Sequence, residues 1–341
     1  MAYRFKLNEP LCKGVRRVAR EQIARARREL HCNSGDIIAA SGVHESRKAI
    51  KRLRALLRFV KPEIGGKAFA ARNAGLRDIA AALSSARDQS ILDETIAKLE
   101  ARFGDQGVVN LTPLRRRLVE LRASIREPLD ASRVQSIQDM ISREGRGLDT
   151  LEFKRGGFEI LAEGLEQSYA KGRTAFAKAC KKPSDDRVHD LRKGVQWHWR
   201  QMALISRAWS PYFEVRVAAA RELSQILGDD HDLAVLVHFA KSEAAAVGSA
   251  SGAIVKMARA RQQELRDEAQ PLATRLFAES PEDFVRRIAC YWEAGRKLKP
   301  HDEATGVEPR EFEIMAPAVA KSSAPRLTVK ADDDAPSRRR A

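Results

Sequence analysis

A short segment of the sequence, VHESRKAIKRLRALLRFV at 43–60, carries six Lys or Arg side chains together with one His and one Glu. Wound as an α-helix, it places five of them on one line, because spacings of three and four residues return to nearly the same azimuth. These are His44, Arg47, Lys51, Arg54 and Arg58. Arginine offers paired donors to an oxyanion, lysine a point charge, and imidazole one or two donors depending on protonation. We therefore expect this stripe to bind a polyanion.

The alternative interpretation of the stripe is a solvated helix face. Such faces usually mix charges of both signs, because Glu and Lys four residues apart attract while like charges repel. Between residues 43 and 62, Glu45 is the only acidic residue, and it lies off the stripe. The self-repulsion of the stripe is tolerable if an anion lies against it, so anion binding is favoured.

The composition of the whole chain points to the same class of partner. The 341 residues carry a formal charge of +16, which suits nucleic acid, an anionic membrane, another polyanion or an acidic protein. Aromatic residues make up only 6% of the chain, and no RNP-like, KH-like or zinc-finger signature is present. A nucleic-acid-binding basic helical protein is therefore the alternative to a binder of another polyanion.

Cysteine spacing and hydropathy bear on compartment and cofactors. The four cysteines show no CxxC spacing, which predicts reduced, buried thiols and no zinc site or disulfide framework. The N-terminus lacks the apolar run of a signal peptide, and no uncharged apolar stretch reaches 18 residues. We expect a soluble, cytoplasmic protein with no membrane partner and no cofactor. The oligomeric state cannot be read from these features.

Ala, Leu, Arg and Glu dominate the chain, and alternating β-type segments are scarce, which predicts an all-α fold. Gly and Pro breaks divide it into expected helices at 10–31, 41–60, 67–101, 111–127, 157–180, 185–207, 212–244, 252–279 and 281–296. From about residue 301 to 341 the sequence has no sustained apolar period, and this tail is expected to be disordered.

The helical segments also contain an internal repeat. VHESRK at 43–48 matches VHDLRK at 188–193, an offset of 145 that also pairs Arg28 with Arg173. LSSARDQSIL at 83–92 matches LGDDHDLAVL at 227–236 at an offset of 144. The pattern predicts two four-helix repeats, the first at about 10–127 and the second at about 157–296, joined by a linker at about 128–156.

These motifs resemble the CHAD domain, the conserved histidine α-helical domain, in which V-H-x-x-R-(K/V) opens the second helix of each four-helix repeat. The resemblance covers about residues 10–296, and so predicts a CHAD domain over 1–300. It implies two pseudo-symmetric four-helix bundles with a basic central groove or pore. It further implies non-catalytic binding of inorganic polyphosphate, with targeting to polyphosphate granules as a role.

The resemblance and the repeat together select the candidate polyphosphate-binding residues. On the helix at 41–60 they are His44, Arg47, Lys48, Lys51, Arg52, Arg54 and Arg58. On the helix at 185–207 they are His189, Arg192 and Lys193, and on the first helix of each repeat they are Arg20, Arg27, Arg28 and Arg173. In the second repeat Gln196, Trp199 and Ala203 replace three of the stripe cations, which predicts a lopsided groove. Trp197 and Trp199 are interpreted as packing residues, and His198 as a core residue.

A different chemistry is suggested by Asp-Asp-His-Asp at 229–232 and by His189-Asp190. All-helical HD phosphohydrolases hold a metal with such residues. However, the repeat places Arg87 opposite His231, and an arginine does not ligate a metal. The acidic residues are better explained as helix caps or partners of arginine. We therefore expect neither a metal site nor catalysis, and keep an HD-like metal-dependent phosphohydrolase as the least favoured alternative.

Overall fold

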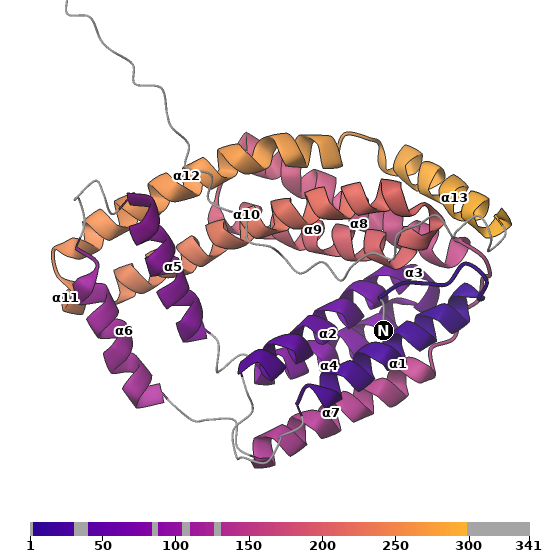
Figure 1. Ribbon diagram of the computed structural model, residues 1–341, viewed down its shortest axis with the longest axis horizontal. Coiled ribbons are helices and arrows are strands. Elements are labelled where there is room, and N and C mark those ends of the chain that lie inside the picture. Colours follow the sequence, from indigo (N-terminus) through magenta and orange to yellow (C-terminus); the bar gives the residue numbers. More distant parts are fainter. Residues whose placement is uncertain (1–2, 31–39, 84–87, 104–109, 126–130, 299–341) are drawn as a thin grey trace, which may run out of the picture. The chain divides into compact units, whose positions relative to one another are not determined.

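A computed structural model describes residues 3–30, 40–83, 88–103, 110–125 and 131–298. All regular structure in these ranges is helical, as the sequence predicts. The described residues belong to one compact unit, Met1–Lys299. Figure 1 shows the helices of this unit. The tail that was expected to be disordered, and Arg87 in the repeat motif, lie outside the described residues.

Most helices begin and end within a few residues of the predicted positions. The exception is the segment 67–101, which the structure describes as two helices, α4 and α5, on either side of residues 84–87. The bounds are α1 Leu11–Arg28, α2 Ala40–Phe59, α4 Gly66–Ala82, α5 Asp88–Phe103, α6 Thr112–Ile125, α8 Glu159–Lys181, α9 Asp185–Ile205, α10 Ser210–Ser242, α12 Ala250–Leu276 and α13 Pro281–Lys297. Helices not predicted are α3 Lys61–Ile64, α7 Ala131–Asp149, α11 Ala244–Val247 and the 3-10 turn η2 Ser206–Ala208.

Helix α7 lies within the segment that we expected to be a linker. It buries Val134, Ile137 and Ile141, whose spacing of three and four residues makes one apolar face. That face packs against α1 and α4, whereas α6, predicted to be the fourth helix of the first bundle, packs against α5 and α11. The group of helices around α2 therefore differs from the predicted bundle, because α7 takes a place that had been given to α6.

The buried side chains form two clusters. The larger one joins α1, α2, α4 and α7 to α8, α9, α13, the first half of α10 and the end of α12. The smaller one joins α5 and α6 to the second half of α10, to α11 and to the start of α12. Figure 1 shows α5 and α6 beside α10, α11 and α12. The 33-residue α10 runs through both clusters and connects them.

Helix α2 is covered on more sides than its sequence pattern indicates. The predicted apolar arc is buried as expected, and consists of Val43, Ile50, Leu53, Leu57 and Val60. In the second half of the helix Ala55 and Phe59 are buried as well, because α2 packs against α8 and α9 in addition to α1 and α4. The cations of α2 are consequently held between neighbouring helices.

The contact between α2 and α8 depends on a glycine. A Cβ atom at Gly164 of α8 would lie 1.9 Å from the carbonyl oxygen of Phe59, so the two backbones approach more closely than any side chain allows. Similarly, a Cβ at Gly194 of α9 would lie 2.7 Å from the Cα of Gly172 in α8. These glycines fix how closely α8 approaches its neighbours.

Replacing Gly164 by alanine is expected to lower the free energy of unfolding by about 2 kcal/mol or more, because a backbone carbonyl cannot move aside. Gly252 in α12 is the matched control, since it is helical, exposed and has no atom within 4 Å of an added Cβ. There the same change should raise the stability by about 0.5 kcal/mol. Urea unfolding followed by circular dichroism measures both, and equal effects would contradict the close approach of α2 and α8.

Two other sequence expectations can be compared with the described residues. Cys12, Cys180 and Cys290 are free thiols. Cys12 is half-buried, but Cys180 and Cys290 are exposed, so the prediction of buried thiols was wrong for these two, and Cys32 lies outside the described residues. None of the described helices combines the length and the apolarity that a bilayer span needs.

Candidate anion-binding site

The stripe predicted on α2 (His44, Arg47, Lys51, Arg54 and Arg58) is mostly half-buried, and only Lys51 is exposed. The Nη1 atom of Arg47 donates to the carbonyl oxygen of Leu83 at 3.0 Å. The Nε atom of Arg54 donates to Oδ1 of Asn73 in α4 at 3.1 Å. The arginines of the stripe are therefore positioned by neighbouring groups, unlike the side chains of a solvated face.

Aromatic rings hold the C-terminal end of the stripe. The guanidinium carbon of Arg58 lies 3.8 Å from the ring centroid of Trp197 in α9 and 5.5 Å from that of Phe69 in α4. Trp197, which was interpreted as a packing residue, thus packs against a cation. A cation over an aromatic face gains about 0.5 to 2 kcal/mol, depending on how far it is desolvated. The contact orients Arg58 without neutralising it.

Packing divides the cations of α2 between two sides of the helix. Arg54 and Arg58 lie toward α4, as their contacts with Asn73 and Phe69 show. Arg52 lies on the side of α1, where its Nη1 donates to Oε1 of Gln22 at 3.5 Å, and its guanidinium carbon is 5.6 Å from the ring centroid of Tyr3. The arginines of the stripe therefore lie on the α4 side of the helix, and Arg52, which is not part of the stripe, lies on another side.

These arginines lack acidic partners. In the part of the chain that the structure describes, Arg52, Arg54 and Arg58 form no ion pair within 4 Å. Burial is the main cause that lowers the pKa of each. The charge of Arg25 adds to this effect at Arg52, that of Arg77 at Arg54, and that of Arg54 at Arg58. Partly desolvated cations beside like charges favour an anion at this surface.

Lys48, by contrast, has an acidic neighbour. Its Nζ lies 2.6 Å from Oε1 of Glu45, and Arg25 of α1 lies 2.9 Å from the other oxygen of the same carboxylate. Burial alone would raise the pKa of Glu45, but Lys48 and Arg25 outweigh it and hold the pKa below its usual value. Glu45 thus neutralises part of the charge at the start of α2.

The second-repeat residues centre on a pair of histidines. His189 of α9 and His231 of α10 lie with ring centroids 4.6 Å apart, and Nδ1 of His189 is buried without a hydrogen-bond partner among the described residues. Burial lowers the pKa of His231 to about 4, with further lowering by the charges of Arg192 and His189. Burial, followed by Lys193 and Arg192, also lowers the pKa of His189. Both imidazoles are therefore neutral at pH 7, and each offers one donor to an anion.

The histidine pair is expected to make the ligand-free protein sensitive to acid. The folded pKa of His231 lies below the value of 6.5 for an unperturbed imidazole, so the unfolded chain takes up its proton first as the pH falls. Stability is expected to decline from about pH 6.5 down to about pH 4. Between pH 7 and about pH 5, the free energy of unfolding of His231→Gln should fall by about 1 kcal/mol less than that of wild type. This value is discounted because His231 is partly exposed. Urea unfolding at each pH measures this, and parallel declines would contradict it.

The other predicted cations are not all gathered at this place. Arg20 donates to Oδ1 of Asp149 at 2.6 Å, so it belongs to the contact between α1 and α7. Arg27 and Arg28 of α1 and Arg173 of α8 are exposed. Lys193 forms an ion pair with Asp190 at 2.5 Å. Their part in anion binding stays a prediction.

Two arginines that the sequence did not single out lie near Arg52. Arg200 of α9 is 8% exposed, and its guanidinium carbon is 4.1 Å from the ring centroid of Trp199. Arg221 of α10 lies against the same ring, at 4.8 Å. At the repeat offset of 145, Arg200 corresponds to Ala55, so a comparison of the two repeats does not indicate a binding role for Arg200. The adjacent Trp199-Arg200 dipeptide was the one local hint.

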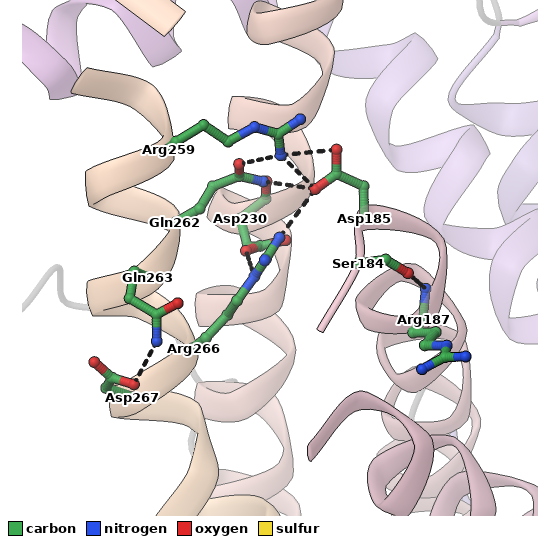
Figure 2. A network of polar contacts seen from close by, with 9 residues as sticks. All are labelled: Ser184, Asp185, Arg187, Asp230, Arg259, Gln262, Gln263, Arg266 and Asp267. Carbon is green, nitrogen blue, oxygen red and sulfur yellow. Dashed lines mark hydrogen bonds and ion pairs between the residues drawn. The ribbon is translucent and has the colours of Figure 1, made fainter. Parts of the chain in front are cut away.

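Of the acidic residues considered for metal binding, Asp229 pairs with Lys98 and Asp190 with Lys193, whereas Asp230 belongs to a network of arginines shown in Figure 2. Asp185, at the start of α9, accepts hydrogen bonds from Arg259 at 2.6 Å and from Arg266 at 3.0 Å, both in α12. Asp230 of α10 accepts from Nε of Arg266 at 2.7 Å, and burial nevertheless raises its pKa. In the described residues no group of three or more His, Cys, Asp or Glu side chains is arranged to hold a metal ion. This network ties α9 to α10 and α12, and so positions His189 beside His231.

Comparison with known protein families matches residues 17–241 to the CHAD domain, which is more than half of the chain. The match includes both histidine motifs, and the stripe with its flanking arginines. No curated protein sequence matches the chain.

Proposed function

Because the chain belongs to the CHAD domain family, which is associated with polyphosphate-related proteins, we propose that it binds inorganic polyphosphate without catalysing a reaction. The observation that supports this most is the set of half-buried arginines on α2, Arg52, Arg54 and Arg58, which have no acidic partner in the described residues. A chain of phosphates supplies one negative charge per unit and needs no sequence-specific contact.

The aromatic residues near these cations favour polyphosphate over nucleic acid. Proteins that bind single strands stack bases on exposed rings. Here Trp197 is covered by Arg58, and Trp199 is flanked by Arg200 and Arg221. The half-buried guanidinium groups are also easier to reach for a slender chain that carries no sugars or bases. The same rings thus orient cations, which leaves less ring surface for a nucleobase to stack on.

We expect the proposed groove to be lopsided. The first repeat contributes the cations of α2, whereas the second contributes neutral imidazoles at His189 and His231, together with Arg192 and Lys193. Such a surface would hold a long polyanion by many weak contacts, which suits recruitment to polyphosphate granules.

A competition assay tests the proposal. Long-chain polyphosphate, RNA and duplex DNA compete for the protein against labelled polyphosphate, at equal phosphate concentration and ionic strength. Phosphate release is followed in parallel with Mg²⁺ or Mn²⁺ present. We expect polyphosphate to compete at least about tenfold better than either nucleic acid, which corresponds to about 1.4 kcal/mol. Equal competition by RNA would contradict the assignment, and metal-dependent phosphate release would indicate a hydrolase instead.

A further inference from the structure

The guanidinium group of Arg200 is one of the least compensated charges among the described residues. It is 8% exposed, and no described carboxylate lies within ion-pair distance. Burial lowers its pKa to about 10, the phenol of Tyr3 counteracts this, and the charges of Arg52, Arg221 and Arg192 lower it further. A buried cation with several like charges around it is unfavourable unless an anion joins them.

The geometry of Arg200 leaves one edge of the guanidinium without a hydrogen-bond partner among the described residues. Trp199 covers a face of the group, and Nη1 donates to the carbonyl oxygen of Gln196 at 2.7 Å. The Nε atom is buried without an acceptor, and Nη2 donates to no atom of the described residues. Together Nε and Nη2 form the edge that binds two oxygens of a carboxylate or phosphate side by side.

The surroundings favour a single anion over a chain that passes through. Tyr3 is 8% exposed, lies over Arg52 and donates its hydroxyl to the carbonyl oxygen of that residue at 2.9 Å. The segment that carries it is anchored by Phe5, whose N–H donates to the carbonyl oxygen of Leu204 at 2.7 Å. A polyphosphate chain that passes through needs openings on two sides of the cations, whereas a terminal phosphate group needs an opening on one side only.

We propose that Arg200, with Arg52 and Arg221 beside it, forms a second anion site that takes one tetrahedral phosphate group on the Nε and Nη2 edge of its guanidinium. The group is either free orthophosphate or the end of a polyphosphate chain. The site shares Arg52 with the cations of α2 and adds Arg200 of α9 and Arg221 of α10, which are not part of the stripe. The identity of the anion as a phosphate rests on the proposed function.

Thermal unfolding of the full chain tests the site. Wild type, Arg200→Met and the control Arg207→Met are compared in chloride, orthophosphate, triphosphate and sulfate at matched ionic strength. Arg207 is exposed in η2, so its replacement removes the same charge from the surface. At about 10 mM phosphate or triphosphate we expect the melting temperature of wild type and Arg207→Met to rise by about 4 °C, and that of Arg200→Met by less than about 1 °C.

The ligands separate the two sources of the phosphate group. If triphosphate stabilises the protein and orthophosphate does not, the site binds chain ends. If triphosphate and orthophosphate both stabilise it, the site binds free phosphate as well. An undiminished response of Arg200→Met, or no response of wild type beyond that in chloride, overturns the inference. If Arg200→Met does not fold, Arg221→Met provides the same comparison from a half-buried position.

The outcome is separable from that of the proposed function. Binding of labelled long-chain polyphosphate is measured on the same three proteins. If wild type and Arg200→Met bind long chains equally and respond equally to phosphate, the second site is wrong while the proposed function stands. If no variant binds long chains, the proposed function fails, whatever the melting temperatures show.

Discussion

Replacing Arg54 and Arg58 together by glutamate is expected to weaken polyphosphate binding by about 100-fold or more at about 100 mM salt. Both guanidinium groups are half-buried on the α4 side of α2 and lack an acidic partner in the described residues. Each reversal removes an attraction and adds a repulsion, together about 1 to 2 kcal/mol per site in a partly desolvated setting. Fluorescence anisotropy with labelled polyphosphate measures the loss.

The control for this double variant changes the net charge equally at another place. Arg207 in η2 and Arg275 near the end of α12 are exposed, and replacing both by glutamate also shifts the net charge by four units. We expect the affinity of the control for polyphosphate to fall by less than about fivefold, since exposed charges are screened within about 10 Å. Circular dichroism verifies that both variants are folded. Equal losses in the two variants would show that net charge, and not the α2 cations, drives binding.

The affinity for long-chain polyphosphate is expected to fall about 300-fold between about 50 and 200 mM salt, if about six cations contact the chain. Counterions released from a linear polyanion produce a straight line of log affinity against log salt, with a slope of about −0.7 per contact for a single strand. Titrations at four salt concentrations measure the slope for wild type.

A neutral double variant connects this slope to particular residues. Arg54→Gln with Arg58→Gln removes two contacts, so the slope should become shallower by about 1.4. The same replacements at Arg207 and Arg275 should leave it unchanged. A wild-type slope near zero would contradict binding along a row of cations, and an unchanged slope in the Arg54 and Arg58 variant would place the contacts elsewhere.

The positions of the helices could be predicted because the apolar period and the Gly and Pro breaks are local signals. The arc on α2 from Val43 to Val60 is buried as the period indicates. Helix α7 has a comparable signal at Val134, Ile137 and Ile141, but the comparison of the two repeats assigned that segment to a linker. Where one half of a chain contains a helix without an obvious counterpart, a repeat is a weaker guide than periodicity.

The surroundings of the cations could not be predicted in the same way. Helical geometry places the stripe on one line, but the groups that surround its charges depend on how α9 and α4 pack against α2. The phenol of Tyr3, nearly 200 residues earlier in the chain, acts electrostatically on Arg200, which shares the ring of Trp199 with Arg221 of the next helix. No local pattern encodes such a meeting of distant segments.

The shared core of α5, α6, α10, α11 and α12 has a consequence for synthesis on the ribosome. Leu92, Ile96 and Leu114, from the first part of the chain, are covered by side chains between Leu233 and Leu265. These apolar residues cannot be buried until more than a hundred further residues have emerged, so the nascent chain exposes them during translation. Binding sites for chaperones should therefore cluster in residues 91–121, and a fragment that ends near residue 150 should aggregate rather than fold independently.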